Sequence, residues 1–156
     1  MLSEQVQTAP QAWVALLRAH AATTRELSAL LVAEHGLTIN DFEALLRLSR
    51  AEGQRMRRVD LAGELLLTAS GVTRLLDGLE AAGYVERASC VSDRRVTYAV
   101  LTEAGAAKLR EAADSHVSAV QALFDERYSE DELEHLGRLL ARLPGAEDTA
   151  GESCTP

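Results

Sequence analysis

The sequence is poor in aromatic residues and cysteines, and it has no long apolar run. Aromatic side chains make up only 4% of the 156 residues. Leucine and alanine dominate instead, and this balance favours packed helices over a β-sandwich. No apolar run approaches the length of a membrane span, and no signal-peptide pattern opens the chain. We therefore expect a mainly helical, cytoplasmic protein with no membrane partner.

The two cysteines and four histidines do not predict a disulfide or a metal site. Cys90 and Cys154 have no metal-type neighbours at short spacing, and Cys154 lies in a polar terminal segment, so independent reduced thiols are expected. The histidines are scattered without the tight spacing of zinc ligands. Because no nucleophile–base set, phosphate loop or carboxylate pair occurs either, we expect no enzyme activity, no metal and no cofactor.

The negative charge of the chain is unevenly distributed. The formal net charge is −8, which by itself argues against a nucleic-acid partner. Residues 50–95, however, contain eight arginines and seven acidic residues, so this segment carries +1 and the remainder carries −9. A weakly basic segment can still bind DNA where its arginines converge on one face.

Hydrophobic periodicity predicts six helices and one hairpin. The helices are expected over residues 11–35, from Thr38 to about residue 52, from about residue 60, and after Thr68, Thr102 and Ser129. Thr38 and Ser129 each begin a capping box, since an acidic residue follows three positions later. Residues 84–87 and 96–101 read as strands joined by a loop over 89–95, and residues 54–58 as a polar, arginine-rich connection.

Residues 59–101 have the element order of a winged helix-turn-helix: a short helix, a turn, an amphipathic helix, and a strand–loop–strand with arginines at its tip. The amphipathic helix carries two stripes at helical spacing. The apolar stripe comprises Val72, Leu75, Leu76 and Leu79, and the polar stripe Ser70, Thr73, Arg74 and Asp77. The fold class expected is mainly α with a small β-hairpin wing.

The polar stripe and the loop tip supply the candidate DNA contacts. Ser70 and Thr73 can reach phosphates or base edges, and Arg74 can fork onto a guanine edge. Arg94 and Arg95 at the wing tip can enter a minor groove, with Asp93 orienting an arginine through a bidentate pair. Upstream of the short helix, Arg55, Arg57 and Arg58 are candidate backbone contacts, and a solvated basic linker is the alternative. Spacing alone favours a solvated helix face, and the flanking turn and hairpin shift the balance toward DNA.

Taken together, the motifs of this stretch resemble the MarR family of bacterial regulators. They are Leu61-Ala62, Val72-Thr73-Arg74-Leu75, Leu79-Glu80, Gly83-Tyr84-Val85-Glu86-Arg87, Asp93-Arg94-Arg95 and Leu101-Thr102-Glu103-Ala104-Gly105. The resemblance implies a triangular homodimer that binds a pseudo-palindromic operator, with Ser70, Thr73 and Arg74 in the major groove and Arg94 in the minor groove. It also implies a repressor that a small phenolic or aromatic effector releases from DNA.

The helices outside the winged segment carry more apolar surface than that segment could cover, which favours a two-fold dimer. We expect an N-terminal dimerisation helix over 1–36, a winged helix-turn-helix domain over 37–101, C-terminal dimerisation helices over 102–144 and a disordered tail over 145–156. Burial of the same helices within one subunit is the alternative.

The effector site is the least specified feature. Trp13, His20 and Arg47 lie on helices that line the cleft of the family, although each also fits an interface or surface position. Two features depart from the family pattern: Gly71 lies in the first turn of the recognition helix, and Cys90 lies at the base of a short wing. The alternatives are therefore a winged-helix adaptor that binds proteins instead of DNA, or a thiol- or metal-responsive regulator.

Overall fold

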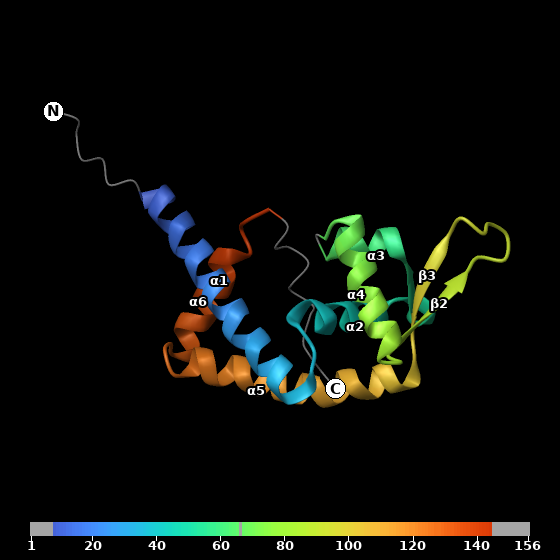
Figure 1. Ribbon diagram of the computed structural model, residues 1–156. Helices are drawn as coiled ribbons and strands as arrows, with labels where there is room; N and C mark the ends of the chain where they lie inside the picture. Colours follow the sequence, from blue (N-terminus) through green and yellow to red (C-terminus); the bar gives the residue numbers. More distant parts are fainter. Residues whose placement is uncertain (1–7, 66, 145–156) are drawn as a thin grey trace.

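A computed structural model describes residues 8–65 and 67–144 of the chain (Figure 1). The expected tail over 145–156, including Cys154, lies outside the described residues. The described helices are α1 Thr8–His35, α2 Ile39–Arg50, α3 Arg58–Glu64, α4 Ala69–Ala81, α5 Glu103–Asp125 and α6 Glu130–Leu140. A single 3-10 turn covers Glu52–Gln54, and the strands are β1 Arg55–Arg57, β2 Val85–Ser89 and β3 Thr97–Leu101. The mainly helical fold class with a small wing is thus confirmed.

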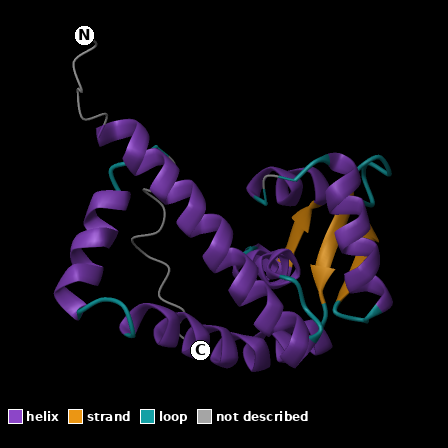
Figure 2. Cartoon of the chain, turned by 60° about the vertical axis from the view of Figure 1, so that its left-hand side comes forward, coloured by secondary structure: helices purple, strands orange, loops and turns teal. Residues whose placement is uncertain are grey.

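The molecule has a lobe and a helical flank. Figure 1 shows α2, α3, α4 and the sheet gathered into the lobe, from which the β2–β3 hairpin projects. The long α5 runs from the lobe to α6, and α1 lies against both α5 and α2. Figure 2, turned by 60°, shows that the outer half of α1 and the whole of α6 extend away from the lobe. None of the described helices is long and apolar enough to cross a membrane.

Helix starts follow local capping chemistry, as the sequence predicted. The Thr38 backbone N–H donates to the Asp41 carboxylate (2.8 Å), and the Asp41 N–H donates back to the Thr38 hydroxyl (3.1 Å). Ser129 and Glu132 form the same reciprocal capping box at α6. Thr68 caps α4 and Thr102 caps α5, each accepting from a backbone N–H three residues on. These bonds satisfy donors that every helix start leaves open.

The core of the lobe lies between α2, α3, α4 and the sheet. Its largest fully buried side chains are Phe42, Leu45, Leu48, Leu61 and Leu76. From α4, Val72 and Leu79 are also buried and Leu75 is half-buried, which confirms the apolar stripe. Burial of this stripe turns the opposite, polar stripe of α4 toward solvent.

The connection expected over residues 54–58 is wrong, because it forms a third strand and the start of α3. β1 pairs antiparallel with β3, which gives a sheet of order β1-β3-β2. Met56 is the half-buried residue of β1, while Arg55 and Arg57 on either side are exposed. The Arg55 guanidinium lies 4.9 Å from the centre of the Tyr98 ring, a cation–π distance. A three-residue, arginine-rich strand is too short to show a period-two pattern.

A tight joint connects α4, β2 and α5. Gly83 adopts φ +78°, a conformation that favours glycine, and ends α4 as expected. The Thr102 hydroxyl donates to the Gly83 carbonyl (2.6 Å), and the Thr102 N–H donates to the Tyr84 carbonyl (3.1 Å). Gly105 packs so closely beneath this turn that a Cβ there would collide with the Tyr84 carbonyl oxygen and the Leu101 side chain.

The flanking helices leave apolar side chains exposed. On α1, Trp13 is 59% exposed and Leu17 is 47% exposed. No described residue of α6 is buried; Leu140, its last residue, is 36% exposed, and Leu143, three residues beyond the helix, is 45% exposed. The apolar stripes expected on these helices are therefore only partly covered within one chain.

Substitution of Gly105 by alanine should destabilise the fold. The added methyl group must displace backbone at the joint, and we expect the free energy of unfolding to fall by about 1–3 kcal/mol. Gly78→Ala is the matched control, since a Cβ at this exposed α4 position meets nothing within 4 Å. It should stabilise the helix by about 0.5–1 kcal/mol. Urea unfolding at fixed protein concentration measures both; equal values for the two variants would contradict the role of the joint.

Stability should also depend on pH through His116. The His116 ring lies 4.8 Å from the Phe42 ring, and burial lowers the pKa of His116 while the Glu43 carboxylate opposes the shift. The unfolded chain therefore binds this proton more readily, so stability is full above pH 6.5 and falls as the pH drops toward the folded pKa. His116→Gln should reduce the dependence of the free energy of unfolding on pH, measured by urea unfolding at several pH values below 6.5. His135→Gln, on the exposed side of α6, should not.

Candidate nucleic-acid interface

The polar stripe of α4 faces solvent at the edge of the lobe. Ser70, Thr73, Arg74 and Asp77 are all exposed. The Thr73 hydroxyl donates to the Ala69 carbonyl (2.9 Å), which leaves its oxygen lone pairs pointing outward as acceptors. Within the described chain, Arg74 makes no ion pair or hydrogen bond. The stripe therefore presents one uncommitted long donor among short hydroxyl side chains.

Gly71 has a packing reason in the first turn of α4. Its N–H donates to the Thr68 hydroxyl (3.1 Å). A Cβ at this position would lie 3.1 Å from the same hydroxyl oxygen and 3.7 Å from the Leu67 Cβ. Glycine thus lets the cap close tightly over the start of the helix, so the residue that departed from the family pattern supports the cap.

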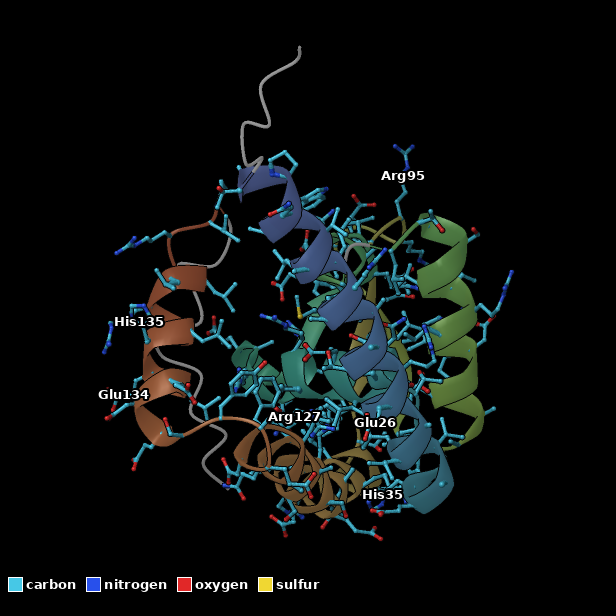
Figure 3. All side chains as sticks on the ribbon, turned by 90° about the vertical axis from the view of Figure 1, so that its left-hand side faces the viewer. Glu26, His35, Arg95, Arg127, Glu134 and His135 are labelled. Carbon is cyan, nitrogen blue, oxygen red and sulfur yellow. The ribbon has the colours of Figure 1, made fainter. Side chains whose placement is uncertain are left out.

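The wing loop is held by Asp93 through its backbone. The Asp93 carboxylate accepts from the Arg95 N–H (3.0 Å), and the Asp93 carbonyl accepts from the Val96 N–H (3.1 Å). Across the part of the chain that the structure describes, no ion pair joins Asp93 to Arg94 or Arg95. The geometry differs from the expected bidentate pair, because the carboxylate fixes the turn and leaves both guanidinium groups exposed. Figure 3 shows Arg95 projecting away from the body of the protein.

Three arginines line a hollow between α3, α4 and the base of the wing. Arg57, Arg58 and Arg95 line this space of about 280 Å³, together with Thr73 and small apolar side chains; no carboxylate is among its lining residues. The Arg58 Nη2 atom is buried without a hydrogen-bond partner among the described residues. Concentrated positive charge beside the polar stripe of α4 suits an anionic group such as a backbone phosphate. Arg57, expected together with Arg58 as a candidate backbone contact, reaches this hollow from strand β1, which the sequence did not predict.

Another arginine of the wing, Arg87 on β2, contacts α4. Its Nε donates to Glu80 Oε1 (3.1 Å) and its Nη2 to Glu80 Oε2 (3.3 Å) and Asp77 Oδ1 (3.3 Å). Arg87 lies seven residues after Glu80 and ten residues after Asp77. The placement of β2 against α4 brings the three side chains together. No periodic pattern in the sequence predicts the contact.

The three candidate effector residues are not brought together. Trp13 and His20 lie exposed on α1, and His20 borders a shallow, mostly apolar hollow that also contains Val32 and Ile39. Arg47 lies on α2, where its Nε is 3.6 Å from a Glu43 oxygen and 3.8 Å from a Glu64 oxygen. Of the three, His20 alone lines the hollow.

Cys90 lies half-exposed at the base of the wing, with its Sγ 3.1 Å from the Ser92 hydroxyl. This hydrogen bond lowers the pKa of the Cys90 thiol, and the backbone N–H groups of Asp93 and Ser92 lower it further. Among the described residues, no group of three or more histidine, cysteine or acidic side chains could hold a metal ion.

Comparison with known proteins relates this geometry to one family. The sequence model of the MarR family matches residues 37–97, which span α2 to the start of β3. The HTH-type transcriptional repressor YetL of Bacillus subtilis is 33% identical over 111 residues, which cover 71% of this chain and 66% of YetL. The matched segment thus falls just short of two thirds of that repressor.

Solved structures agree with the sequence matches over a longer span. AbsC, a MarR family transcriptional regulator from Streptomyces coelicolor, superposes with a TM-score of 0.76 at 36% identity, covering 94% of this chain and 97% of AbsC. Sco3205, a regulator of the same family and organism solved in complex with DNA, superposes with a TM-score of 0.75 at 27% identity, covering 84% and 82% of the two chains. These relatives are transcriptional regulators rather than enzymes. The chain described here therefore belongs to the MarR family of winged-helix transcriptional regulators.

Proposed function

We propose that this protein is a homodimeric, cytoplasmic repressor that binds a pseudo-palindromic operator and is released by a small aromatic or phenolic effector. The observation that carries the proposal is the arginine-lined hollow directly beside the exposed stripe of α4. One surface thus combines a phosphate-binding charge with side chains that can contact base edges. Two relatives support the proposal, since Sco3205 was solved in complex with DNA and YetL is named a repressor.

Each candidate residue has a role in the proposed complex. Ser70, Thr73 and Arg74 enter the major groove, where Arg74 supplies the long donor for a guanine edge. Arg58, with Arg57, grips a backbone phosphate at the hollow, and Arg95 closes its wing side. Arg94 at the wing tip reaches the minor groove, while Asp93 keeps the loop in shape through the Arg95 N–H.

The helical flank is proposed to form the two-fold interface. The helices α1 and α6 extend away from the lobe (Figure 2) and carry exposed apolar side chains, including Trp13, Leu17 and Leu140; Leu143 just after α6 is exposed as well. Such a surface costs free energy in water unless a second copy covers it. The terminal segments 1–36 and 102–144 would then dimerise, and residues 37–101 would bind DNA.

The effector is proposed to bind at the α1 side of the lobe. His20 lines a shallow apolar hollow there, and a second subunit packed on α1 would deepen it. An aromatic acid fits an apolar surface bordered by His20 and Arg25. Trp13 lies on the same helix, two turns from His20, while Arg47 would contribute only by leaving its contacts with Glu43 and Glu64.

The proposed DNA contacts are tested by Arg74→Ala and Arg94→Ala on the operator enriched from random duplexes. Loss of a base-edge contact at Arg74 should cost about 1–3 kcal/mol of binding and relax specificity. Loss of Arg94 should weaken binding and reduce the slope of log affinity against log salt by about one unit. Arg110→Ala is the control, because it removes an exposed arginine of α5 that belongs neither to the proposed DNA contact nor to the exposed apolar surface of α1 and α6. Shift assays at several salt concentrations measure all three.

Affinities of both variants equal to that of the parent would show that the proposed surface does not bind DNA. Failure of the parent to enrich any sequence, together with capture of a defined protein partner, would favour the winged-helix adaptor instead.

The proposed dimer is tested by placing a charge on its apolar surface. Leu140→Glu should shift the protein from dimer to monomer in light scattering, because burial of an unpaired carboxylate is costly. Ala107→Glu, at an exposed position in the α5 segment nearest the lobe, should leave the mass unchanged. A dimer that survives Leu140→Glu and Leu17→Glu together would place the interface elsewhere.

A further inference from the structure

The recognition helix carries two acidic residues on its outer side, although its proposed partner is a polyanion. Asp77 belongs to the exposed polar stripe, where it shares a shallow hollow with Ser70, Thr73 and Arg74. Glu80 follows one turn later and is less exposed: its side chain is 29% accessible, compared with 58% for Asp77. A free carboxylate at either position would repel the phosphates on both sides of a groove.

Arg74 and Asp77 are also placed to pair with each other. Residues three apart on a helix are neighbours, and an arginine and an aspartate at this spacing attract. In the structure they form no ion pair, since Asp77 is instead 3.3 Å from the Nη2 of Arg87. The Asp77 carboxylate therefore pairs with Arg87 of the wing, and Arg74 forms no ion pair with any described residue.

The Glu80 carboxylate provides the anchor for Arg87. Both of its oxygens accept from the same guanidinium, at 3.1 Å from Nε and 3.3 Å from Nη2. A two-bond fork fixes the guanidinium plane, and the fixed plane directs Nη2 at Asp77 as well. The register Arg87↔Ala99 in the sheet holds the backbone of this arginine beside α4.

We propose that Arg87 is a positioning residue for DNA recognition: anchored on Glu80, it occupies the Asp77 carboxylate and so keeps Arg74 free to contact DNA. The inference rests on the proposed function and deepens it, because it names a residue outside the DNA contact that sets the charge and freedom of the recognition stripe. Fold stability is a minor part of the role, since ion pairs between exposed groups contribute little to the free energy of folding.

The test compares Arg87→Ala, Asp77→Asn and the double variant for binding to the selected operator. Arg87→Ala should weaken binding roughly threefold to tenfold at low salt, because Asp77 then pairs with Arg74 or repels phosphate. The double variant should recover most of the lost affinity, since the asparagine carries no charge to pair or repel and the carboxylate left free, Glu80, is the less exposed of the two. Asp77→Asn alone should bind at least as tightly as the parent. Arg110→Ala again serves as the control for loss of one positive charge.

Two readouts separate this role from a purely structural one or a direct phosphate contact. Circular dichroism melting should be nearly the same for Arg87→Ala and the parent, and the salt slope should be unchanged, whereas a lost phosphate contact lowers the slope by about one unit. Arg87→Lys, which cannot form the fork, should fall between parent and alanine.

The inference is overturned where Arg87→Ala binds like the parent, where Asp77→Asn alone weakens specific binding, or where the double variant stays as weak as Arg87→Ala. Any of these results leaves the proposed function intact, because the parent still selects its operator. A parent that selects no DNA sequence overturns the proposed function, and this inference with it.

Discussion

The close contact at Gly105 is the constraint on which the arrangement of the lobe depends. At this point the end of α4, the start of β2, the end of β3 and the first turn of α5 meet within one set of hydrogen bonds made by Thr102. Since no side chain intervenes at Gly105, α5 approaches the Tyr84 backbone directly. The recognition helix, the wing and the long helix of the flank are thereby fixed relative to one another at a single joint.

Local chemistry made much of the fold predictable. Helix starts at Thr38, Thr68, Thr102 and Ser129 follow from a side-chain oxygen and the backbone three residues later, so no distant part of the chain is needed to place them. β1 could not be foreseen in this way, because the strand with which it pairs, β3, begins about 40 residues later. The sheet, and with it the position of Arg57, is a product of tertiary pairing.

The candidate site likewise has one part that the sequence predicts and another that depends on tertiary pairing. Ser70, Thr73 and Arg74 could be grouped from the sequence because they share one face of one helix. The hollow formed by Arg57, Arg58 and Arg95 joins three elements, and the Arg87 contact with Asp77 and Glu80 joins two, so neither has a spacing that marks it. The role of Asp93 was similarly out of reach, since a carboxylate two residues before an arginine N–H can bond either the backbone or a guanidinium.

The uneven charge of the chain has a consequence for how the protein meets DNA. With residues 50–95 at +1 and the rest at −9, the protein is an electric dipole whose weakly positive end is the proposed binding face. Near a duplex, the phosphates attract that end and repel the remainder, so approaching molecules turn before they touch. The same repulsion would discourage random adhesion along the duplex, so the acidic surface outside the proposed DNA contact would add to the selectivity of the regulator.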